Sequence, residues 1–412
     1  MNTQRVGLYL WGGPGTIRMI RLKFFDPKID EESLMRSYEY DYLARMRDTF
    51  GITDVWATYS WGFSDEREKE DREFLVSKAE NFTRLGLRLH AYIQGANLVY
   101  RDFPDSDWWA RDERGRLIPY HRGRKVTCLN NPGFRAYVAS KIRRMRGLGF
   151  DGVFMDNIQM GQLAMGARHR LLAFAGCACD YCKTLFEDAT GHEIPRRLRN
   201  DAITHEYLAF RAASTTSFIE AAANEAHDAR LLFGSNSFDP SFDTEVVFGT
   251  DLGEIARIQD YLLFENHAFP RRGVSHNLPA ELIAREIRKP VFVVSYARGI
   301  GRDAALSQDQ LNAWRGERQI ATFSSCLKGS EYVTDGVWHN LDPFAYEMPV
   351  PAPIRFEAPS KKQPGKYVGA VSRLIPPLGL AVRHSYNPLM TRFMEGKRMR
   401  AYLDHVYHAT IR

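Results

Sequence analysis

The stretch that decides the fold is GFDGVFMDNIQMG, residues 149–161, in which a run of apolar and β-branched residues ends at Asp156 and Asn157. Side chains alternate along a β-strand, so Phe154 and Asp156 share one face of this segment, while Asp151 lies on the other. A buried strand that closes on a carboxylate and an amide is either a strand that runs into a turn or one half of an active site. The pattern of the surrounding chain decides between these two interpretations.

Short apolar runs alternate with longer helical patterns along most of the chain. The helical patterns are punctuated as expected, since the segment 132–149 begins with Pro132 and ends with Gly149. Strands that alternate with helices pair in parallel, and eight such units predict a closed (β/α)₈ barrel. The eight predicted strands are residues 5–11, 52–62, 87–95, 150–157, 231–237, 261–267, 290–299 and 330–338.

An open, doubly wound sheet is the alternative to the barrel. Such a sheet usually has fewer strands and a glycine-rich phosphate loop after the first one. The segment WGGPGT, residues 11–16, is glycine-rich at that place, but it lacks the G-x-G-x-x-G spacing and no helix is expected to open directly from it. The barrel is therefore the predicted fold.

Three segments depart from the plain repeat of strand and helix. Residues 97–131 form a long loop after the third predicted strand, and residues 158–200 form a long excursion after the fourth. A Pro-rich stretch begins after residue 345 and leads to a last helical pattern. We therefore expect a catalytic barrel over residues 1–345, with both loop insertions, and an extension over residues 346–412 that packs on the barrel.

The composition is that of a globular protein with a mildly basic charge. The 412 residues are 44% hydrophobic and carry a net charge of +6, which excludes wholesale disorder. KIRRMR, residues 141–146, is the nearest approach to a basic stripe, and on a helix it spreads around the axis as a solvated face. A nucleic-acid partner is therefore not expected.

Membrane and export signals are not recognised in the sequence. The N-terminal segment lacks the basic, apolar and small-residue regions of a signal peptide, and no apolar run reaches the ~18 residues that a membrane helix needs. The sequence predicts a soluble, cytoplasmic protein without a membrane partner, and it leaves a homo-oligomer open.

Polar and aromatic residues gather where the predicted strands end. In a (β/α)₈ barrel, catalytic groups come from these ends and from the loops that follow them. Aromatic rings stack on the C–H faces of a sugar while amides and charged groups bind its hydroxyls, so the set predicts a carbohydrate substrate, although aromatic residues are frequent throughout this chain. The predicted substrate-binding residues are Trp11, Tyr59, Trp61, Gln94, Asn97, Trp108, Trp109, Asn157, Asn236, His267, Tyr296, Arg298 and Trp338.

Two carboxylates stand at strand ends on the same side of the predicted barrel. Asp156 closes the fourth strand and Glu265 follows the apolar run of the sixth, whereas Asp151 opens its strand at the opposite end and is interpreted as structural. Glycoside hydrolysis uses such a facing pair, so we predict Asp156 as the nucleophile and Glu265 as the general acid/base. A capping or ion-paired role is the alternative for each.

Four of the five cysteines fall in a pattern typical of a metal site. CACDYC supplies Cys177, Cys179 and Cys182 in the loop after the fourth strand, and Cys128 lies in the neighbouring loop. Four thiolates close a tetrahedral Zn²⁺ site of the structural type. Free buried thiols, or a site completed by His169 or His192, remain as alternatives.

The cysteine pattern resembles the zinc-binding arrangement of the family 42 β-galactosidases. Those enzymes carry an Asn-Glu pair at the end of the fourth strand, whereas this chain has Asp156-Asn157, so their catalytic assignment does not carry over. GFDGVFMDN together with CDYCKTLFEDATG is similar to barrel families grouped as hypothetical glycosyl hydrolases. An Asp nucleophile after strand four and an acid/base after strand six resembles the α-galactosidase and dextranase type of site.

These observations predict a retaining glycoside hydrolase that cleaves an oligosaccharide or a glycoside and carries a structural Zn²⁺. The alternative from another class is a non-catalytic carbohydrate-binding barrel with the same aromatic mouth. A barrel enzyme with a metal at its mouth is disfavoured, because no predicted strand carries a His-x-His pair or a similar set of ligands.

Overall fold

Seven parallel strands form the central sheet of the protein. Each neighbouring pair is parallel, in the order β1-β3-β4-β7-β8-β9-β10. The strands are β1 (Gly7–Leu10), β3 (Asp54–Ser60), β4 (Arg88–Gln94), β7 (Gly152–Asp156), β8 (Leu232–Asn236), β9 (Tyr261–Asn266) and β10 (Val291–Ser295). They coincide with the first seven predicted strands, and the parallel barrel architecture is confirmed.

The computed structural model describes twelve stretches of the chain. These are residues 5, 7–10, 12–23, 28–29, 31–120, 122–161, 175–198, 201–237, 244–266, 289–295, 333–334 and 337–338. The helical patterns that separate the last three predicted strands, residues 278–289 and 307–329, lie almost wholly outside these residues. The predicted extension over 346–412 lies wholly outside them. The domain boundary at residue 345 therefore remains a prediction.

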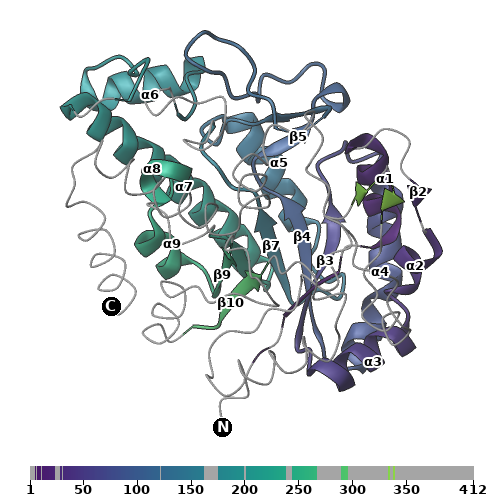
Figure 1. The fold of residues 1–412 in the computed structure, drawn as a ribbon. Coiled ribbons are helices and arrows are strands. Elements are labelled where there is room, and N and C mark those ends of the chain that lie inside the picture. Colours follow the sequence, from purple (N-terminus) through teal and green to yellow (C-terminus); the bar gives the residue numbers. More distant parts are fainter. Residues whose placement is uncertain are drawn as a thin grey trace.

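Helices cover the outside of the sheet. Figure 1 shows α1 to α4 on one side of the strands and α7 to α9 on the other. A helix does open within the glycine-rich segment 11–16, so the expectation that none would is wrong: Pro14 suits the first turn, where a missing N–H costs no hydrogen bond. The helices are α1 (Gly13–Lys23), α2 (Glu31–Arg36), α3 (Tyr40–Phe50), α4 (Lys69–Arg84), α5 (Pro132–Arg143), α6 (Asp180–Thr190), α7 (Ala202–Asp228), α8 (Thr244–Phe248) and α9 (Leu252–Ile258).

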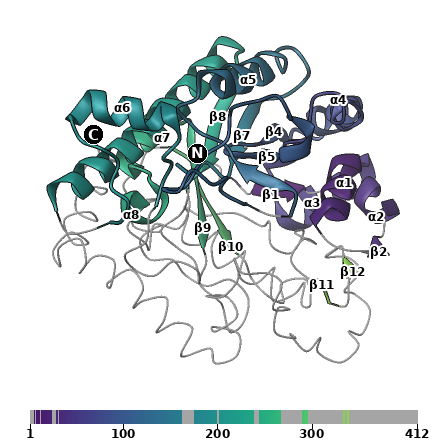
Figure 2. The same ribbon diagram turned by 90° about the horizontal axis from the view of Figure 1, so that it is seen from above.

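The sheet curves into a nearly closed barrel. Trp56 of β3 packs edge-on against Phe292 of β10 with ring centroids 4.9 Å apart, and its indole N–H donates to the hydroxyl of Tyr261 in β9 at 3.0 Å. Side chains from both halves of the sheet therefore meet in one interior, and Figure 2 shows the strands gathered within the curve of helices.

Strict alternation along the strands builds two cores. In β7, Phe154 belongs to the interior cluster with Trp56 and Tyr92, while Val153 and Met155 pack outward under the helices. This is the pattern expected of parallel strands buried on both faces. A residue at the carboxyl end of a strand therefore lies at the barrel mouth when it occupies the same alternate position as Phe154.

The eighth predicted strand is not part of the barrel. Within residues 330–338 the structure has two short strands, β11 (Val333–Thr334) and β12 (Val337–Trp338), which pair with each other antiparallel. β12 also pairs in parallel with β2 (Lys28–Ile29). Asp335-Gly336, the dipeptide between them, is typical of a two-residue hairpin turn. Because the described residues of this segment pair with each other antiparallel, the prediction of one continuous strand is wrong.

The predicted long loop 97–131 has its own structure. β5 (Asn97–Val99) pairs antiparallel with β6 (Arg124–Val126), and a short 3₁₀ helix, η1 (Tyr100–Asp102), follows β5. Two-stranded pairing satisfies backbone groups that a loop of this length would otherwise leave to water. Two backbone hydrogen bonds join the loop to the residues that follow β3 and β4: the N–H of Val99 donates to Gly62 at 2.8 Å, and that of Thr127 donates to Ala96 at 2.9 Å.

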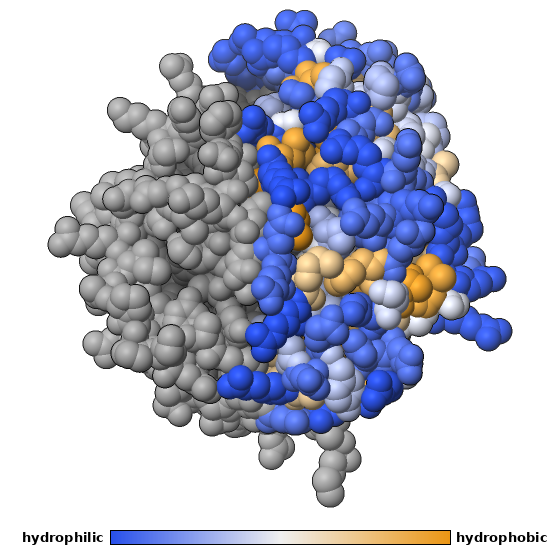
Figure 3. All heavy atoms as spheres, turned by 90° about the vertical axis from the view of Figure 1, so that its right-hand side faces the viewer, coloured by the Kyte–Doolittle hydropathy of each residue, from blue (hydrophilic) through white to orange (hydrophobic). Residues whose placement is uncertain are grey.

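The outer face formed by α1 to α4 is mostly hydrophilic, with separate hydrophobic patches (Figure 3).

In the basic run 141–146, Arg143, Arg144 and Arg146 are exposed as predicted, but Lys141 is buried. Among the helices in the described part of the chain, none has the length and apolar character needed to cross a membrane.

Candidate active site

Asp156 lies at the carboxyl end of β7 and points into the barrel mouth. The side chain is buried, and four donors surround it. Oδ1 accepts from the backbone N–H of Asn157 and from Nδ2 of Asn236, both at 2.7 Å. Oδ2 accepts from Nδ2 of Asn157 at 2.9 Å and from the hydroxyl of Tyr92. Two strands and the loop after β7 therefore hold one carboxylate in a fixed orientation.

Tyr92 joins β4 to this carboxylate. Gln94 and Asp156 are register partners across β4 and β7, which brings Tyr92, two residues earlier on the same face, under Asp156. Burial and, second, the charge of Asp156 raise the pKa of Tyr92 well above its ordinary value. The phenol therefore stays protonated at neutral pH and remains a donor to the carboxylate.

An amide network fixes the neighbouring residues. Asn157 has a left-handed backbone (φ 57°), which Asn tolerates better than most residues, and its Nδ2 also reaches Oε1 of Gln94 at 3.2 Å. The same Oε1 accepts from Nδ2 of Asn97 at 3.0 Å, and the hydroxyl of Tyr120 donates to Oδ1 of Asn157. Hydrogen bonds with Gln94, Asp156 and Tyr120 thus fix the side chain of Asn157 in the turn after β7.

Glu265 lies in β9, two residues after Leu263. Leu263 is the register partner of Asn236 and belongs to the interior cluster, and Glu265 itself pairs in register with Val294 of β10. Glu265 therefore occupies the same alternate position of its strand as Leu263. Its side chain is outside the described part of the structure.

Four of the predicted substrate-binding residues form the group around Asp156: Gln94, Asn97, Asn157 and Asn236. Trp61 lies beside them, because its ring packs 5.1 Å from that of Tyr92 and its indole N–H donates to Thr16 at 3.2 Å. Trp11, His267, Tyr296 and Arg298 lie outside the described residues, and of Trp338 only the backbone in β12 is described.

The other three predicted aromatics are not brought together with Asp156. Tyr59 has the opposite parity to Trp56 and packs outward, edge-on against Phe150 at 5.6 Å. Trp108 packs on Tyr137 at 5.0 Å, and the indole N–H of Trp109 donates to Ser106 inside the loop. Alternation explains Tyr59, and the packing of the long loop against α5 explains Trp108.

Two residues of the site were not predicted. Tyr92 could have been found from its parity, because it shares a face with Gln94 in the run LRLHAYIQG. Tyr120 carries no such signal, since it lies in the long loop and reaches Asn157 only through the tertiary fold.

The four cysteines of the predicted metal site come together in the structure. Cys128 follows β6, Cys177 and Cys179 precede α6, and Cys182 lies in its first turn. All four are buried, and their sulfur atoms lie within 4.8 Å of one another. A tetrahedral ion with Zn–S bonds of ~2.3 Å requires sulfurs about 3.8 Å apart. The cluster therefore has the composition and the spacing to hold a metal ion.

The cysteine cluster favours a thiolate. Hydrogen bonds from Cys128 and then Cys177 lower the pKa of Cys179, while hydrogen bonding within the group raises the pKa of Cys128 and of Cys182. The Sγ of Cys128 is 3.4 Å from that of Cys179 and 3.5 Å from that of Cys182. Thiolates are the metal-binding form of cysteine.

A nearly closed parallel barrel with helices outside it places the chain in the (β/α)₈ fold class, and a buried carboxylate with amide donors lies at the mouth of this barrel. The profile of hypothetical glycosyl hydrolase family 15 matches residues 88–237, a segment that contains β4, β7, β8 and the whole group around Asp156. The resemblance to the hypothetical glycosyl hydrolase families is confirmed, whereas the link with family 42 remains a prediction. A search of the curated proteins found no match.

Solved structures share the fold. A β-galactosidase from Halorubrum lacusprofundi is 14% identical with a TM-score of 0.51, over 78% of this chain and 52% of that one. An α-L-fucosidase from Paenibacillus thiaminolyticus is 13% identical with a TM-score of 0.50, over 84% and 48%. The PgaB glycoside hydrolase domain from Bordetella bronchiseptica is 13% identical with a TM-score of 0.51, over 78% and 93%. The chain matches only about half the length of the galactosidase and the fucosidase.

Proposed function

We propose that the protein is a retaining glycoside hydrolase in which Asp156 is the nucleophile. The observation that carries this proposal is the position of Asp156 at the mouth end of β7, with both oxygens bound by donors from β4, β8 and the following turn. Hydrogen-bond donors stabilise a carboxylate in its ionised form, which a nucleophile requires. The family profile over residues 88–237 supports the same chemistry.

Attack by Asp156 requires one of its lone pairs, and Asn157 is suited to release it. Nδ2 of Asn157 is bonded both to Oδ2 of Asp156 and to Oε1 of Gln94. A sugar hydroxyl that accepts from this amide takes one donor away from the carboxylate. Substrate binding then frees Oδ2 for the anomeric carbon, while Tyr92 and Asn236 keep the carboxylate aligned.

Glu265 is proposed as the acid/base partner. In the first step Oδ2 of Asp156 bonds to the anomeric carbon, the glycosidic C–O bond breaks, and the proton of Glu265 passes to the leaving oxygen. In the second step Glu265 takes a proton from water, the water oxygen bonds to the anomeric carbon, and Asp156 leaves. The position of Glu265 on β9, two strands from β7, supports this assignment.

A panel of aryl glycosides and oligosaccharides, followed by NMR of the anomeric proton, tests the function. We expect cleavage of at least one member with net retention, and loss of turnover in Asp156→Asn and in Glu265→Gln with an unchanged circular dichroism spectrum. Inversion would contradict the retaining mechanism. Binding of saccharides without any turnover would instead favour the non-catalytic carbohydrate-binding barrel.

We also propose that the cysteine cluster holds a structural Zn²⁺. Four thiolates leave no coordination position for a substrate, so the ion would join the loop after β6 to the start of α6 rather than take part in catalysis. Nδ2 of Asn130, 3.5 Å from Sγ of Cys182, is placed to donate to one of the ligands.

A further inference from the structure

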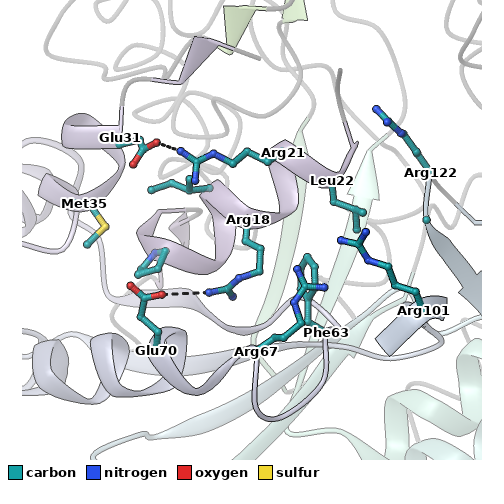
Figure 4. A pocket seen from close by; sticks show the side chains of 13 residues that line it. Arg18, Arg21, Leu22, Glu31, Met35, Phe63, Arg67, Glu70, Arg101 and Arg122 are labelled. Carbon is teal, nitrogen blue, oxygen red and sulfur yellow. Dashed lines mark hydrogen bonds and ion pairs between the residues drawn. The ribbon is translucent and has the colours of Figure 1, made fainter. Parts of the chain in front are cut away.

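A cavity whose lining does not include the group around Asp156 opens between α1, α2, α4 and the loop that follows β4. Its volume is about 830 Å³, within the range of small-molecule sites. The wall is unusually basic, since it carries two glutamates, Glu31 and Glu70, against five arginines: Arg18, Arg21, Arg67, Arg101 and Arg122. Figure 4 shows these side chains around the cavity.

The charge is divided unevenly between the two sides of the cavity. On one side Arg21 pairs with Glu31, and Arg18 lies 3.4 Å from Glu70 and also pairs with Asp71. Figure 4 shows Glu31 and Glu70 together on this side, with Arg67, Arg101 and Arg122 on the opposite side. The opposite side is therefore the electropositive one.

One carboxylate, that of Asp102, interacts with two guanidinium groups on the electropositive side. Asp102 lies 2.8 Å from Nη1 of Arg67 and 3.8 Å from Nε of Arg101, and it also accepts from the backbone N–H of Ser64 at 3.2 Å. Asp102 is only 4% exposed, whereas Arg101 is 67% exposed. Because Asp102 is shared by two guanidinium groups, these three described side chains together carry a net positive charge at the cavity surface.

The ring of Phe63 contacts two arginines of the cavity wall, Arg67 on the electropositive side and Arg18 on the other side. The guanidinium carbon of Arg67 lies 4.8 Å from its ring centroid and that of Arg18 lies 5.6 Å from it. Cation–π contacts of this kind restrict the guanidinium groups before any ligand binds. Preorganised donors lose less conformational entropy when they bind a carboxylate or a sulfate.

The cavity lies on the same side of the barrel as Asp156. α1 follows the mouth end of β1, Phe63 follows that of β3, and Arg101 belongs to the loop after β4. Trp61 links the two places, since its ring packs on Tyr92, the donor to Asp156, and its indole N–H donates to Thr16 in α1. The cavity and Asp156 therefore lie at the same end of the barrel, and Trp61 contacts both the donor to Asp156 and the helix that forms one wall of the cavity.

We propose that this cavity binds the acidic groups of an anionic saccharide, a ligand that carries carboxylates or sulfates. The saccharide part rests on the proposed glycosidase function, whereas the preference for anions rests on the arginines alone. Arg67 and Arg101 supply planar donors whose geometry matches carboxylate and sulfate oxygens. The site thus selects the charge of the substrate, and Asp156 acts at a different place on it.

Isothermal titration calorimetry on the full chain with Asp156→Asn tests the proposal without turnover. The probes are trigalacturonate, its neutral methyl ester, a sulfated disaccharide and inorganic sulfate. We expect at least one acidic saccharide to bind about tenfold or more tightly than the methyl ester, and to bind more weakly as NaCl screens the charges. The proposal would be overturned if neither acidic saccharide bound more tightly than the methyl ester.

Arg101→Glu and Arg114→Glu form a matched pair of variants. Arg101 is 67% exposed and 3.8 Å from Asp102, and Arg114 is 70% exposed and 3.4 Å from Glu113, but Arg114 lies outside the cavity wall. We expect Arg101→Glu to weaken binding of the acidic saccharide about tenfold and Arg114→Glu to leave it unchanged. Equal effects of the two variants would contradict the site.

The remaining outcomes separate this proposal from the proposed function. Inorganic sulfate that binds as tightly as the acidic saccharides would overturn the saccharide part. An enzyme that cleaves glycosides but binds neither acidic saccharide more tightly than the ester would overturn the anionic site alone. A protein that binds the acidic saccharide through Arg101 and cleaves no glycoside would overturn the glycosidase and leave the site in place.

Discussion

The hydroxyl of Tyr92 donates a hydrogen bond to Oδ2 of Asp156 across the neighbouring strands β4 and β7. This contact belongs to the barrel itself rather than to a loop, because both residues lie on strands of the central sheet. It makes the orientation of the proposed nucleophile a property of the strand register.

Tyr92→Phe removes this donor and keeps the ring. Loss of a hydrogen bond to a charged group costs about 1.5–3 kcal/mol. We therefore expect kcat/KM to fall about 10- to 100-fold and the melting temperature to fall as well, because the bond to the buried carboxylate also stabilises the folded protein. Tyr59→Phe is the matched control, since Tyr59 is a buried tyrosine on the outward face of β3. Equal losses in both variants would show that the hydroxyl of Tyr92 has no specific effect on the proposed nucleophile.

The metal site predicts about one zinc per chain by elemental analysis. A chelator that strips the ion should lower the melting temperature, because the loop after β6 and the start of α6 lose their common anchor. Cys182→Ser should lower the zinc content, whereas Cys326→Ser, which changes the fifth cysteine, should not. Freshly purified protein with less than about half an equivalent of zinc would contradict the Cys₄ site.

A buried ion pair anchors α5 to the loop after β3. Nζ of Lys141 lies 2.9 Å from Oε2 of Glu68 and 2.8 Å from Oγ of Ser60, and both charged side chains are almost fully buried. Lys141→Met leaves Glu68 as an unpaired buried charge, so the free energy of unfolding should fall by about 3–5 kcal/mol. Urea denaturation measures it.

Lys183→Met is the control for this variant. Lys183 pairs with Asp180 at 3.0 Å on α6, but both side chains are largely exposed, at 56% and 95%. We expect a change below about 1 kcal/mol for this surface pair. If Lys141→Met lowered the free energy of unfolding by no more than Lys183→Met does, the buried pair would contribute no more than a surface pair.

Asp71 makes the stability depend on pH. Burial raises the pKa of Asp71 from 3.8 to about 6, although Arg18 opposes the shift. Between about pH 4 and 6 the folded protein therefore binds more protons than the unfolded chain does. Because of this difference, the contribution of Asp71 to stability falls as the pH rises from about 4 to 6. Asp71→Asn removes the titrating group and should flatten this slope.

Urea midpoints between pH 4 and 7 measure the effect of Asp71→Asn. The difference between the wild-type and variant slopes should amount to about 1–3 kcal/mol over this window. Asp180→Asn, at a carboxylate that is 95% exposed, should leave the slope unchanged. Parallel curves for wild type and Asp71→Asn would contradict the raised pKa.

The barrel strands could be predicted because each is a short apolar run between helical patterns. Parity also separated the two aspartates of the opening stretch correctly: Asp156 closes β7, whereas Asp151 stands before its start and accepts from the backbone N–H of Leu89 at 2.8 Å. The eighth strand could not be predicted from periodicity, because the apolar pattern does not show that β11 and β12 pair with each other antiparallel.

The remaining features depend on tertiary contacts. Tyr92 meets Asp156 only through the register of β4 with β7, and a helical wheel around Lys141 does not reveal that Glu68 lies opposite. The basic cavity gathers Arg18 of α1 with Arg67 and Arg101, which are far apart in the chain. A single sequence shows the types of these residues but not their proximity.

Trapping of the glycosyl-enzyme intermediate tests the central claim most directly. A 2-deoxy-2-fluoroglycoside of a sugar that the enzyme cleaves slows the second step of a retaining mechanism, so the covalent adduct accumulates. Mass spectrometry of the digested protein should locate the sugar on Asp156, and Asp156→Asn should show no adduct. A sugar found on another carboxylate, Glu265 included, would contradict the account.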